Sequence, residues 1–117
     1  MEAERGFIPA AIADVHRSGA IIAAVCTGTM LLAAAALLRG RPAITHSRAI
    51  ADLTASGARV IRARVVDDGD VVTSGGVTSG LDLALWLVER HAGSKLAHAV
   101  EQQLEYERRG VVWRRPG

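Results

Sequence analysis

The chain has 117 residues, half of them hydrophobic, and carries 14 basic and 12 acidic side chains for a formal net charge of +2. This length is enough for one domain with its own hydrophobic core. The near balance of interspersed charges gives no support to a nucleic-acid or acidic-membrane binder. The only cysteine, Cys26, cannot form an internal disulfide, so we expect no extracellular disulfide scaffold and favour the reducing cytoplasm.

An uncharged run at residues 19–38 has about the length that spans a bilayer. Its first part is short and rich in isoleucine, and its centre holds two threonines and a glycine, which help a spanning helix least. The chain also begins with acidic residues and lacks the basic and apolar regions of a secretory signal. We therefore expect neither a membrane span nor a membrane partner.

The first half of the chain alternates helix and strand patterns. Residues 8–18 have apolar residues at helical spacing, and Pro9 stands near the start of this predicted helix. Residues 20–25 show no alternation, which predicts a strand buried on both faces, as central parallel strands are. Residues 30–38 are apolar nearly all round, so they predict a deeply covered helix, which Gly40 ends.

The middle of the chain is richer in strands. A short strand is expected at residues 43–46, followed by a helix at residues 48–56. Residues 59–66 alternate apolar and charged side chains, which predicts one half-exposed strand. The sequence "DDGD" at residues 67–70 predicts a hairpin turn, and it lacks the further ligands of a calcium loop. Residues 71–74 are then the strand that pairs back.

Two helices and a basic tail complete the predicted elements. The first helix, residues 81–92, is expected to point Leu81, Leu85 and Val88 inward. The second, residues 95–109, is expected to point Leu96, Val100 and Leu104 inward. The tail at residues 110–117 predicts a solvated or partly disordered end rather than a phosphate-binding patch. This order of elements predicts a single α/β domain, 1–117, with a mostly parallel sheet and helices on both faces.

Cys26 lies where strand periodicity gives way to helix periodicity. On a tight turn, its sulfur would face the amides at the start of the next helix, which favour a thiolate. The small residues Thr27, Gly28 and Thr29 suit such a turn, and their amides could stabilise an oxyanion. A buried, inert cysteine accounts for the same pattern. The residues alone leave both interpretations open.

His46 is the second candidate for chemistry. It follows the predicted short strand and could approach the thiol as a base or as an orienting group, although a histidine before a helix cap is more often structural. The other histidines, His16, His91 and His98, lie at spacings that do not converge on a zinc site. The sequence predicts no metal and no organic cofactor.

The glycine-rich stretch "GGVTSG" at residues 75–80 is not a P-loop, because no Lys-Ser or Lys-Thr follows it. One interpretation is a plain turn between a strand and a helix, capped by Thr78 or Ser79. The other places its backbone near Cys26 or at a dimer interface. On the second interpretation, Gly75, Gly76 and Val77 line the pocket of the site.

Three stretches together resemble the ThiJ/PfpI superfamily, which has the class I glutamine-amidotransferase-like fold: "IAAVCTGTMLLAAAALLRGRPAITH", "VVDDGDVVTSGGVTSGLDLALWLVE" and "LEYERRG". The resemblance runs from about residue 8 to about residue 109. It is nearest to the isonitrile hydratase-like branch and to the amidase-like sensor domains of AraC-type regulators. It implies a partial doubly wound, flavodoxin-like sheet.

The resemblance also implies roles for individual residues. Cys26 would be the nucleophile on an elbow, with Thr27 assisting, and His46 would stand where this branch has the histidine of Thr-His-Trp, here followed by Ser47. The oxyanion side would be formed by the backbone of Thr27, Gly28 and Thr29. The implied chemistry is thiolate attack on an isonitrile carbon, which makes the protein a lyase or hydratase.

The chain also departs from this pattern. The family's first strands, one of which supplies an acidic residue to the cysteine, have no counterpart here, so the chain is expected to be N-terminally truncated relative to the family. The strand at residues 20–25 would then lack a neighbour, which predicts a homodimer through the open sheet edge or a longer reading frame. Three functions follow: a cysteine-dependent hydratase, a non-catalytic ligand-sensing or oligomerisation domain, or an inactive remnant.

Overall fold

The computed structural model describes residues 2–116, and their side chains from Ile8 onward. Its main sheet has four strands in the order β1-β5-β4-β6, with β5 parallel to β1, antiparallel to β4, and β4 parallel to β6. These strands are β1 (Ile22–Ala24), β4 (Val65–Asp67), β5 (Val71–Ser74) and β6 (Trp113–Arg114). A second, parallel sheet pairs β2 (Pro42–Ala43) with β3 (Arg59–Val60). The predicted α/β fold is confirmed.

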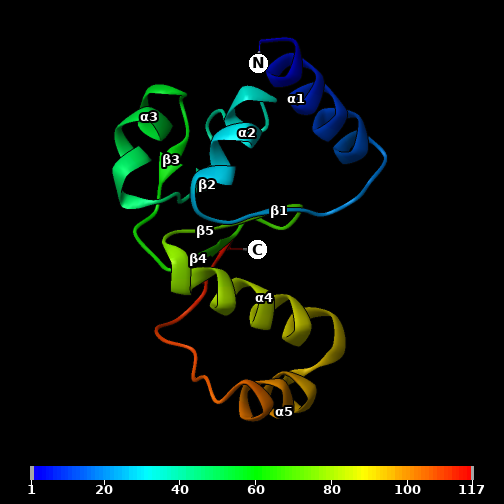
Figure 1. The fold of residues 1–117 in the computed structure, drawn as a ribbon, viewed down its shortest axis with the longest axis vertical. Helices are drawn as coiled ribbons and strands as arrows, with labels where there is room; N and C mark the ends of the chain where they lie inside the picture. The colour runs from blue at the N-terminus through cyan, green and yellow to red at the C-terminus, as the bar shows by residue number, and fades with distance from the viewer. Residues whose placement is uncertain (1, 117) are drawn as a thin grey trace.

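Helices cover both faces of the main sheet (Figure 1). On one side lie α1 (Glu2–Arg17), α2 (Thr29–Ala34) and α3 (Ile50–Ala55), together with the small sheet and two 3-10 turns, η1 (Cys26–Gly28) and η2 (Ser47–Ala49). On the other side lie α4 (Val77–Ala92) and, outside it, α5 (Ser94–Leu104). None of the described helices is long and apolar enough to cross a membrane.

Strand β5 separates two hydrophobic clusters. Val71 packs into the cluster beneath α2 and α3, where Leu32 and Leu53 are also buried. Its neighbour Val72 packs into the cluster beneath α4, with Trp86. Successive side chains of a strand point to opposite faces, so one short strand contributes to both cores. Each such buried side chain stabilises the fold by about 1.5–3 kcal/mol.

The predicted hairpin is confirmed, but the single strand predicted before it is wrong. Val65 pairs with Ser74 across the hairpin, and the amide of Asp68 donates to the carbonyl of Val71 at 2.9 Å. Gly69 in the turn has φ 93°, a conformation that favours glycine. Residues 59–66, however, divide into β3 and β4, which belong to different sheets. Because apolar and charged side chains alternate without interruption from β3 into β4, the sequence pattern did not show that the two strands are separate.

Four predicted helix bounds need correction. In the second half of the chain, α4 begins at Val77 rather than at residue 81, and α5 ends at Leu104 rather than at residue 109. The first helix begins well before residue 8 and contains Pro9 in its interior rather than near its start. The helix after the cysteine ends at Ala34, because Ala36 adopts a left-handed φ of 61° that an α-helix cannot contain. Leu38 nevertheless reaches the core from the following loop, where it is 1 % exposed.

The predicted inward faces of the last two helices are partly wrong. Leu85 is buried, but Leu81, Leu96 and Leu104 are all more than two-fifths exposed. In α5 the fully buried side chain is Ala97. Because α5 packs mainly on α4, a small alanine permits the close approach of the two helices, and the larger apolar residues remain outside.

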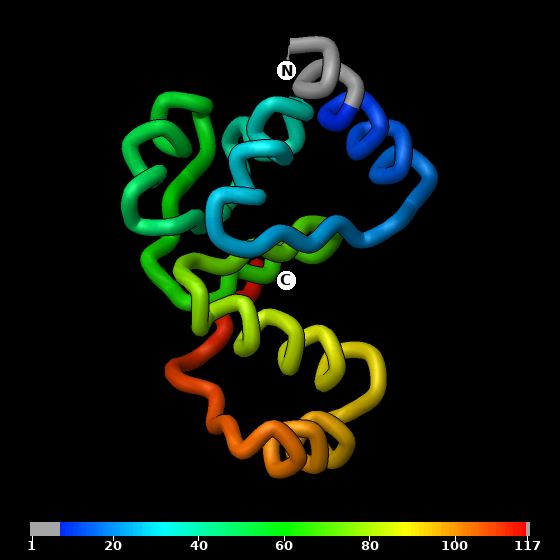
Figure 2. Tube along the Cα trace, viewed as in Figure 1, coloured from blue at the N-terminus to red at the C-terminus, as the bar shows by residue number. Residues whose placement is uncertain are grey.

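The basic tail is also more ordered than expected. Figure 2 follows the chain back from α5 to the main sheet, where Trp113 and Arg114 form β6. The guanidinium of Arg114 lies over the Trp86 ring, 5.2 Å from its centroid, and that of Arg59 lies 5.6 Å from the Trp113 centroid. These contacts, and the packing of Val112 against the second cluster, fix a segment that composition alone describes as solvated.

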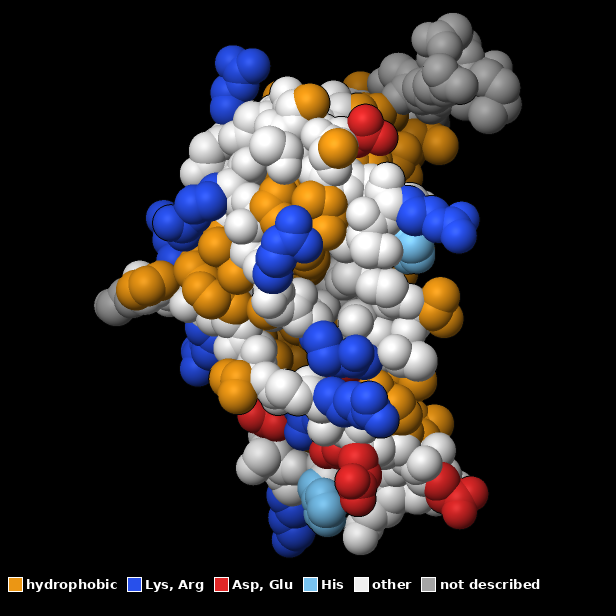
Figure 3. Space-filling view, turned by 90° about the vertical axis from the view of Figure 1, so that its left-hand side faces the viewer, with side chains coloured by type: hydrophobic (Ala, Val, Ile, Leu, Met, Phe, Trp, Pro, Cys, Tyr) orange, Lys and Arg blue, Asp and Glu red, His pale blue; other side chains and the backbone are white. Residues whose placement is uncertain are grey.

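Surface charge is unevenly distributed over one face of the molecule. Figure 3 shows basic side chains over its upper and middle parts, while the acidic ones gather mainly toward the lower end. The lower end of the molecule is formed by α4, α5 and the residues that follow α5 (Figure 1).

Candidate functional site

The bend predicted at Cys26 is present. Val25 is extended, with φ −118° and ψ 148°, and Cys26, the first residue of η1, then has a left-handed φ of 55° before α2 begins. A residue with a side chain adopts this conformation at a cost of about 1–2 kcal/mol. The surrounding contacts must therefore impose it, and they produce an elbow between β1 and α2 rather than a continuous helix.

Two threonine hydroxyls tie this elbow to the segment that carries His46. Thr45 Oγ1 donates to the carbonyl of Cys26 at 2.9 Å, and Thr29 Oγ1 donates to the carbonyl of Ile44 at 3.0 Å. Both threonines are at most 1 % exposed. The hydroxyl of Thr29 thus supports the fold, and Thr45 is a contributor that the sequence pattern did not single out.

The amides of the elbow differ in their availability. The Gly28 amide donates to the carbonyl of Val25 at 2.9 Å, and the Thr29 amide donates to the carbonyls of Cys26 and Thr27. For the Thr27 amide no acceptor is recorded among residues 2–116. Of the three amides suggested for the oxyanion side, that of Thr27 is the one with its donor uncommitted.

His46 is half-buried and caps η2. Its Nδ1 accepts a hydrogen bond from the amide of Arg48 at 3.1 Å, so in the neutral ring the proton is assigned to Nε2. Within the described residues, no hydrogen bond joins His46 to the sulfur of Cys26. Thr45 brings the histidine segment to the elbow, and Nε2 is the ring atom left to act on a substrate.

The glycine-rich turn after β5 lies close to both the elbow and the segment that carries His46. A Cβ on the buried Gly75 would lie 3.5 Å from the carbonyl oxygen of Thr45, and a Cβ on Gly80 would lie 3.6 Å from Val25 Cγ1. Gly76 caps α4, and the side chain of Val77 is 83 % exposed. The turn therefore lies against both the elbow and the His46 segment, at the carboxyl ends of β1 and β5, where α/β sheets place their ligands.

A cluster of ion pairs near α1 lies at the other end of β5, where that strand begins. Arg41 pairs with Asp68 and Asp70, and His16 Nε2 lies 2.6 Å from Asp70 Oδ2. The hydrogen bonds from Arg41 hold the pKa of Asp70 well below its usual range. Asp70 precedes β5, whereas Gly75 follows it, so this cluster anchors the hairpin and contributes nothing to the elbow.

Comparison with known proteins decides the family. The model of the DJ-1/PfpI family matches residues 3–90, which is more than half of the chain. The chain belongs to the DJ-1/PfpI family. The matched residues include the elbow at Cys26, and the resemblance indicated by the sequence is confirmed.

Individual relatives fall into two groups. The chain is 44% identical over 85 residues to the isonitrile hydratase of Pseudomonas putida, covering 73% of this chain and 37% of that protein. It is 35% identical over 94 residues to the HTH-type transcriptional regulator GbdR of Pseudomonas aeruginosa, covering 79% and 26%. A solved ThiJ/PfpI family protein from Pseudomonas syringae superposes with a TM-score of 0.70 at 36% identity, covering 76% and 37%. The chain thus spans well under half the length of each.

Proposed function

We propose that Cys26 is the nucleophile of a site that hydrates a small carbon–nitrogen electrophile, with an isonitrile as the substrate class. The left-handed backbone of Cys26 is the observation that carries the proposal. Strain of this kind persists at sites where it positions a reacting group. The 44% identity to an isonitrile hydratase supports the choice of substrate.

The proposed reaction needs water and no oxidant. The Cys26 thiolate forms a carbon–sulfur bond to the terminal isonitrile carbon, and that carbon is protonated to give a thioimidate. Water then adds to the same carbon, the carbon–sulfur bond breaks, and the thiol returns as the N-substituted formamide leaves. The hydroxyl of Thr27 would position the water, whose protons pass to the substrate nitrogen and to the departing sulfur, and the N–H at His46 Nε2 would donate a hydrogen bond to the substrate nitrogen.

Turnover of n-butyl isonitrile to N-butylformamide, followed by proton NMR, tests the proposal. Cys26→Ser should reduce the rate at least about a hundredfold, and Thr27→Val about tenfold. Thr54→Val is the matched control, because its hydroxyl bonds only within α3, to Ile50, and its rate should equal that of the wild type. An inactive wild-type protein, or an active Cys26→Ser variant, would refute thiol catalysis.

A second candidate function is ligand sensing without chemistry. The relationship to an HTH-type transcriptional regulator favours it, as does the commitment of His46 Nδ1 to the backbone. A sensor would bind n-butyl isonitrile or its formamide with no product formed, and both the wild type and Cys26→Ser would show the same rise in melting temperature. An inactive remnant would show neither turnover nor binding.

The homodimer also stays a proposal. Within the described residues β1 pairs on one edge only, with β5, and Ile21 and Val25 beside it are 38% and 45% exposed. No charge in residues 19–38 opposes a second copy at this edge, although charged residues commonly protect such edges. Light scattering should find a dimer that Ala23→Lys, on the exposed edge, converts to a monomer, while Ala34→Lys on α2 leaves it intact.

A further inference from the structure

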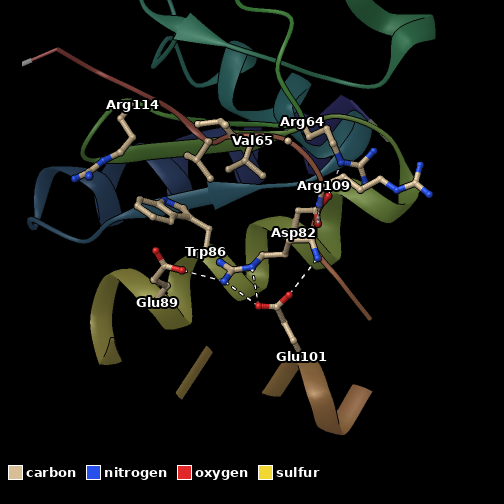
Figure 4. Close-up of a pocket in the computed structure, with 12 residues that line it drawn as sticks. Arg64, Val65, Asp82, Trp86, Glu89, Glu101, Arg109 and Arg114 are labelled. Atoms are coloured by element: carbon tan, nitrogen blue, oxygen red, sulfur yellow. Dashed lines mark hydrogen bonds and ion pairs between the residues drawn. The ribbon is translucent and has the colours of Figure 1, made fainter. Parts of the chain in front are cut away.

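The two flanks of α4 differ in how they are covered. Toward α5 and the segment 108–114, α4 borders a hollow of about 440 Å³ whose lining carboxylates are all held by arginines (Figure 4). Glu89 and Glu101 both lie 2.9 Å from Arg108 Nη2, as the dashed lines of Figure 4 show. The chain's own contacts therefore close this flank. The flank toward β1 is open.

Three side chains in and beside β1 point toward the α4 face of the sheet, namely Ile21, Ala23 and Val25. Their neighbours Ile22 and Ala24 pack into the cluster on the opposite face, and successive side chains of a strand alternate between faces. Val25 lies against α4, because a Cβ on Gly80 would lie 3.6 Å from Val25 Cγ1. All three side chains are exposed, and none is charged. This flank is therefore an apolar surface without a cover among the described residues.

The backbone of β1 has an open edge beside this surface. The amide of Ile22 donates to the carbonyl of Asp70 at 2.9 Å, so Ile22 directs its backbone groups toward β5. Successive residues of a strand alternate in this direction, and the N–H and C=O of Ala23 therefore point to the other edge. No strand of the described residues pairs with β1 there. One residue thus offers both a donor and an acceptor.

We propose that β1 pairs antiparallel with β1 of a second copy, with Ala23 opposite Ala23 on the two-fold axis. The inference rests on the homodimer of the proposed function and specifies which residues meet in it. In this register each Ala23 exchanges two hydrogen bonds with its counterpart. Ile21 of one copy then lies opposite Val25 of the other. The main sheet continues from one copy into the next.

The edge itself favours a second copy as its partner. A two-fold axis through Ala23 matches each donor with an acceptor and each apolar side chain with another apolar one. No charge in residues 19–38 repels the second copy. The small side chain of Ala23 also permits the two backbones to approach. A strand with polar side chains on this face would instead lose hydration against Ile21 and Val25.

The proposed pairing reaches the Cys26 site. Val25 directly precedes Cys26 in the chain. Ile21 of the second copy, opposite Val25, would therefore border the elbow with an apolar side chain. Each copy would complete the surroundings of the other copy's elbow.

Disulfide trapping in the Cys26→Ser background tests the register, because the chain has no other thiol. Opposite residues that exchange two hydrogen bonds have Cα atoms about 5.5 Å apart, which a disulfide can bridge. Ala23→Cys should therefore form a covalent dimer under mild oxidation, read by non-reducing electrophoresis. Ala34→Cys, an exposed alanine on α2, is the matched control and should give at least about fivefold less covalent dimer.

A mixture of Ile21→Cys and Val25→Cys, both in the same background, tests the pairing independently. The mixture should form a mixed disulfide. Neither variant alone should cross-link, because identical positions would lie about 13 Å apart along the strands.

The outcomes separate the register from the homodimer. A monomer in light scattering would overturn both. A dimer that forms no disulfide at position 23, or in which Ile21→Cys cross-links with itself, would overturn this register alone. Because every variant lacks Cys26, none of these results depends on isonitrile chemistry.

Discussion

The elbow and the α4–α5 layer are held by different kinds of contact. At the elbow, short hydroxyls and amides fix the backbone, as in the 2.9 Å bond from Thr45 to the carbonyl of Cys26. In the α4–α5 layer, arginines such as Arg64 and Arg108 pair with carboxylates. Neutral contacts position a backbone without placing a charge beside it, whereas ion pairs hold layers together and leave surplus arginines at their margin. The first kind of contact suits the positioning of a reacting group, and the second suits the packing of one helix layer on another.

Replacement of Asp82 in the α4–α5 layer is expected to have the largest effect on the free energy of unfolding. Asp82→Ala leaves Arg64 and the Tyr106 hydroxyl without their acceptor in a place where Asp82 itself is 2 % exposed. Because Arg64 is partly exposed, we expect a loss of about 2–4 kcal/mol in the free energy of unfolding in urea.

Glu107→Ala is the matched control for Asp82→Ala, because Glu107 is an exposed carboxylate outside every recorded ion pair of the described residues. It should change the free energy of unfolding by less than about 0.5 kcal/mol. Equal effects of the two variants would show that the ion pairs do not hold this layer.

Removal of the hydroxyl of Thr45 tests the neutral hydrogen bonds that hold the elbow. Thr45→Val keeps the shape of the side chain but leaves the carbonyl of Cys26 without this donor, so unfolding should become easier by about 1–2 kcal/mol. If the tie positions the nucleophile, isonitrile turnover of the folded variant should fall as well. A variant that is less stable but turns over n-butyl isonitrile at the wild-type rate would restrict Thr45 to a structural role.

The sequence predicted the features that depend on residues close to one another in the chain. The change of period at Cys26 and the turn residues around Gly69 depend on neighbours within a few positions, and the elbow and hairpin are where the pattern placed them. The resemblance also named His46, whose segment reaches the elbow through Thr45.

Long-range contacts were not predictable in the same way. Arg64 meets Asp82 across 18 positions and Tyr106 across 42, and no periodicity encodes such a pair. The pairing of Trp113 with Val66 was hidden by a basic tail whose composition is typical of a solvated end. The arrangement of α4, α5 and the segment 108–114 depends on these contacts, which explains why composition and spacing did not indicate it.

The backbone strain at Cys26 predicts a smaller effect. Glycine adopts a φ near 55° without the cost that a Cβ brings, so Cys26→Gly should be more stable than Cys26→Ala by about 1 kcal/mol. Ala36, with φ 61°, provides a reference outside the proposed site, and Ala36→Gly should stabilise by a similar amount. Urea unfolding of the variants measures both differences. A glycine that destabilises at position 26 alone would mean that the elbow is not strained in solution.

The smallest effect concerns acid stability. Arg41 holds the pKa of Asp70 below its unfolded value of about 3.9, so this pair contributes fully above about pH 4 and its contribution is lost as the pH falls below that value. Since the Asp70 side chain is 46% exposed, solvent screening limits the expected loss in Asp70→Asn to about 0.5 kcal/mol at pH 7. Urea unfolding at pH 7 and at pH 3 should show that the difference between Asp70→Asn and the wild type shrinks in acid. A difference that stays constant would assign the contribution to the neutral hydrogen bonds of the hairpin anchor, because only the ionised carboxylate depends on pH in this range.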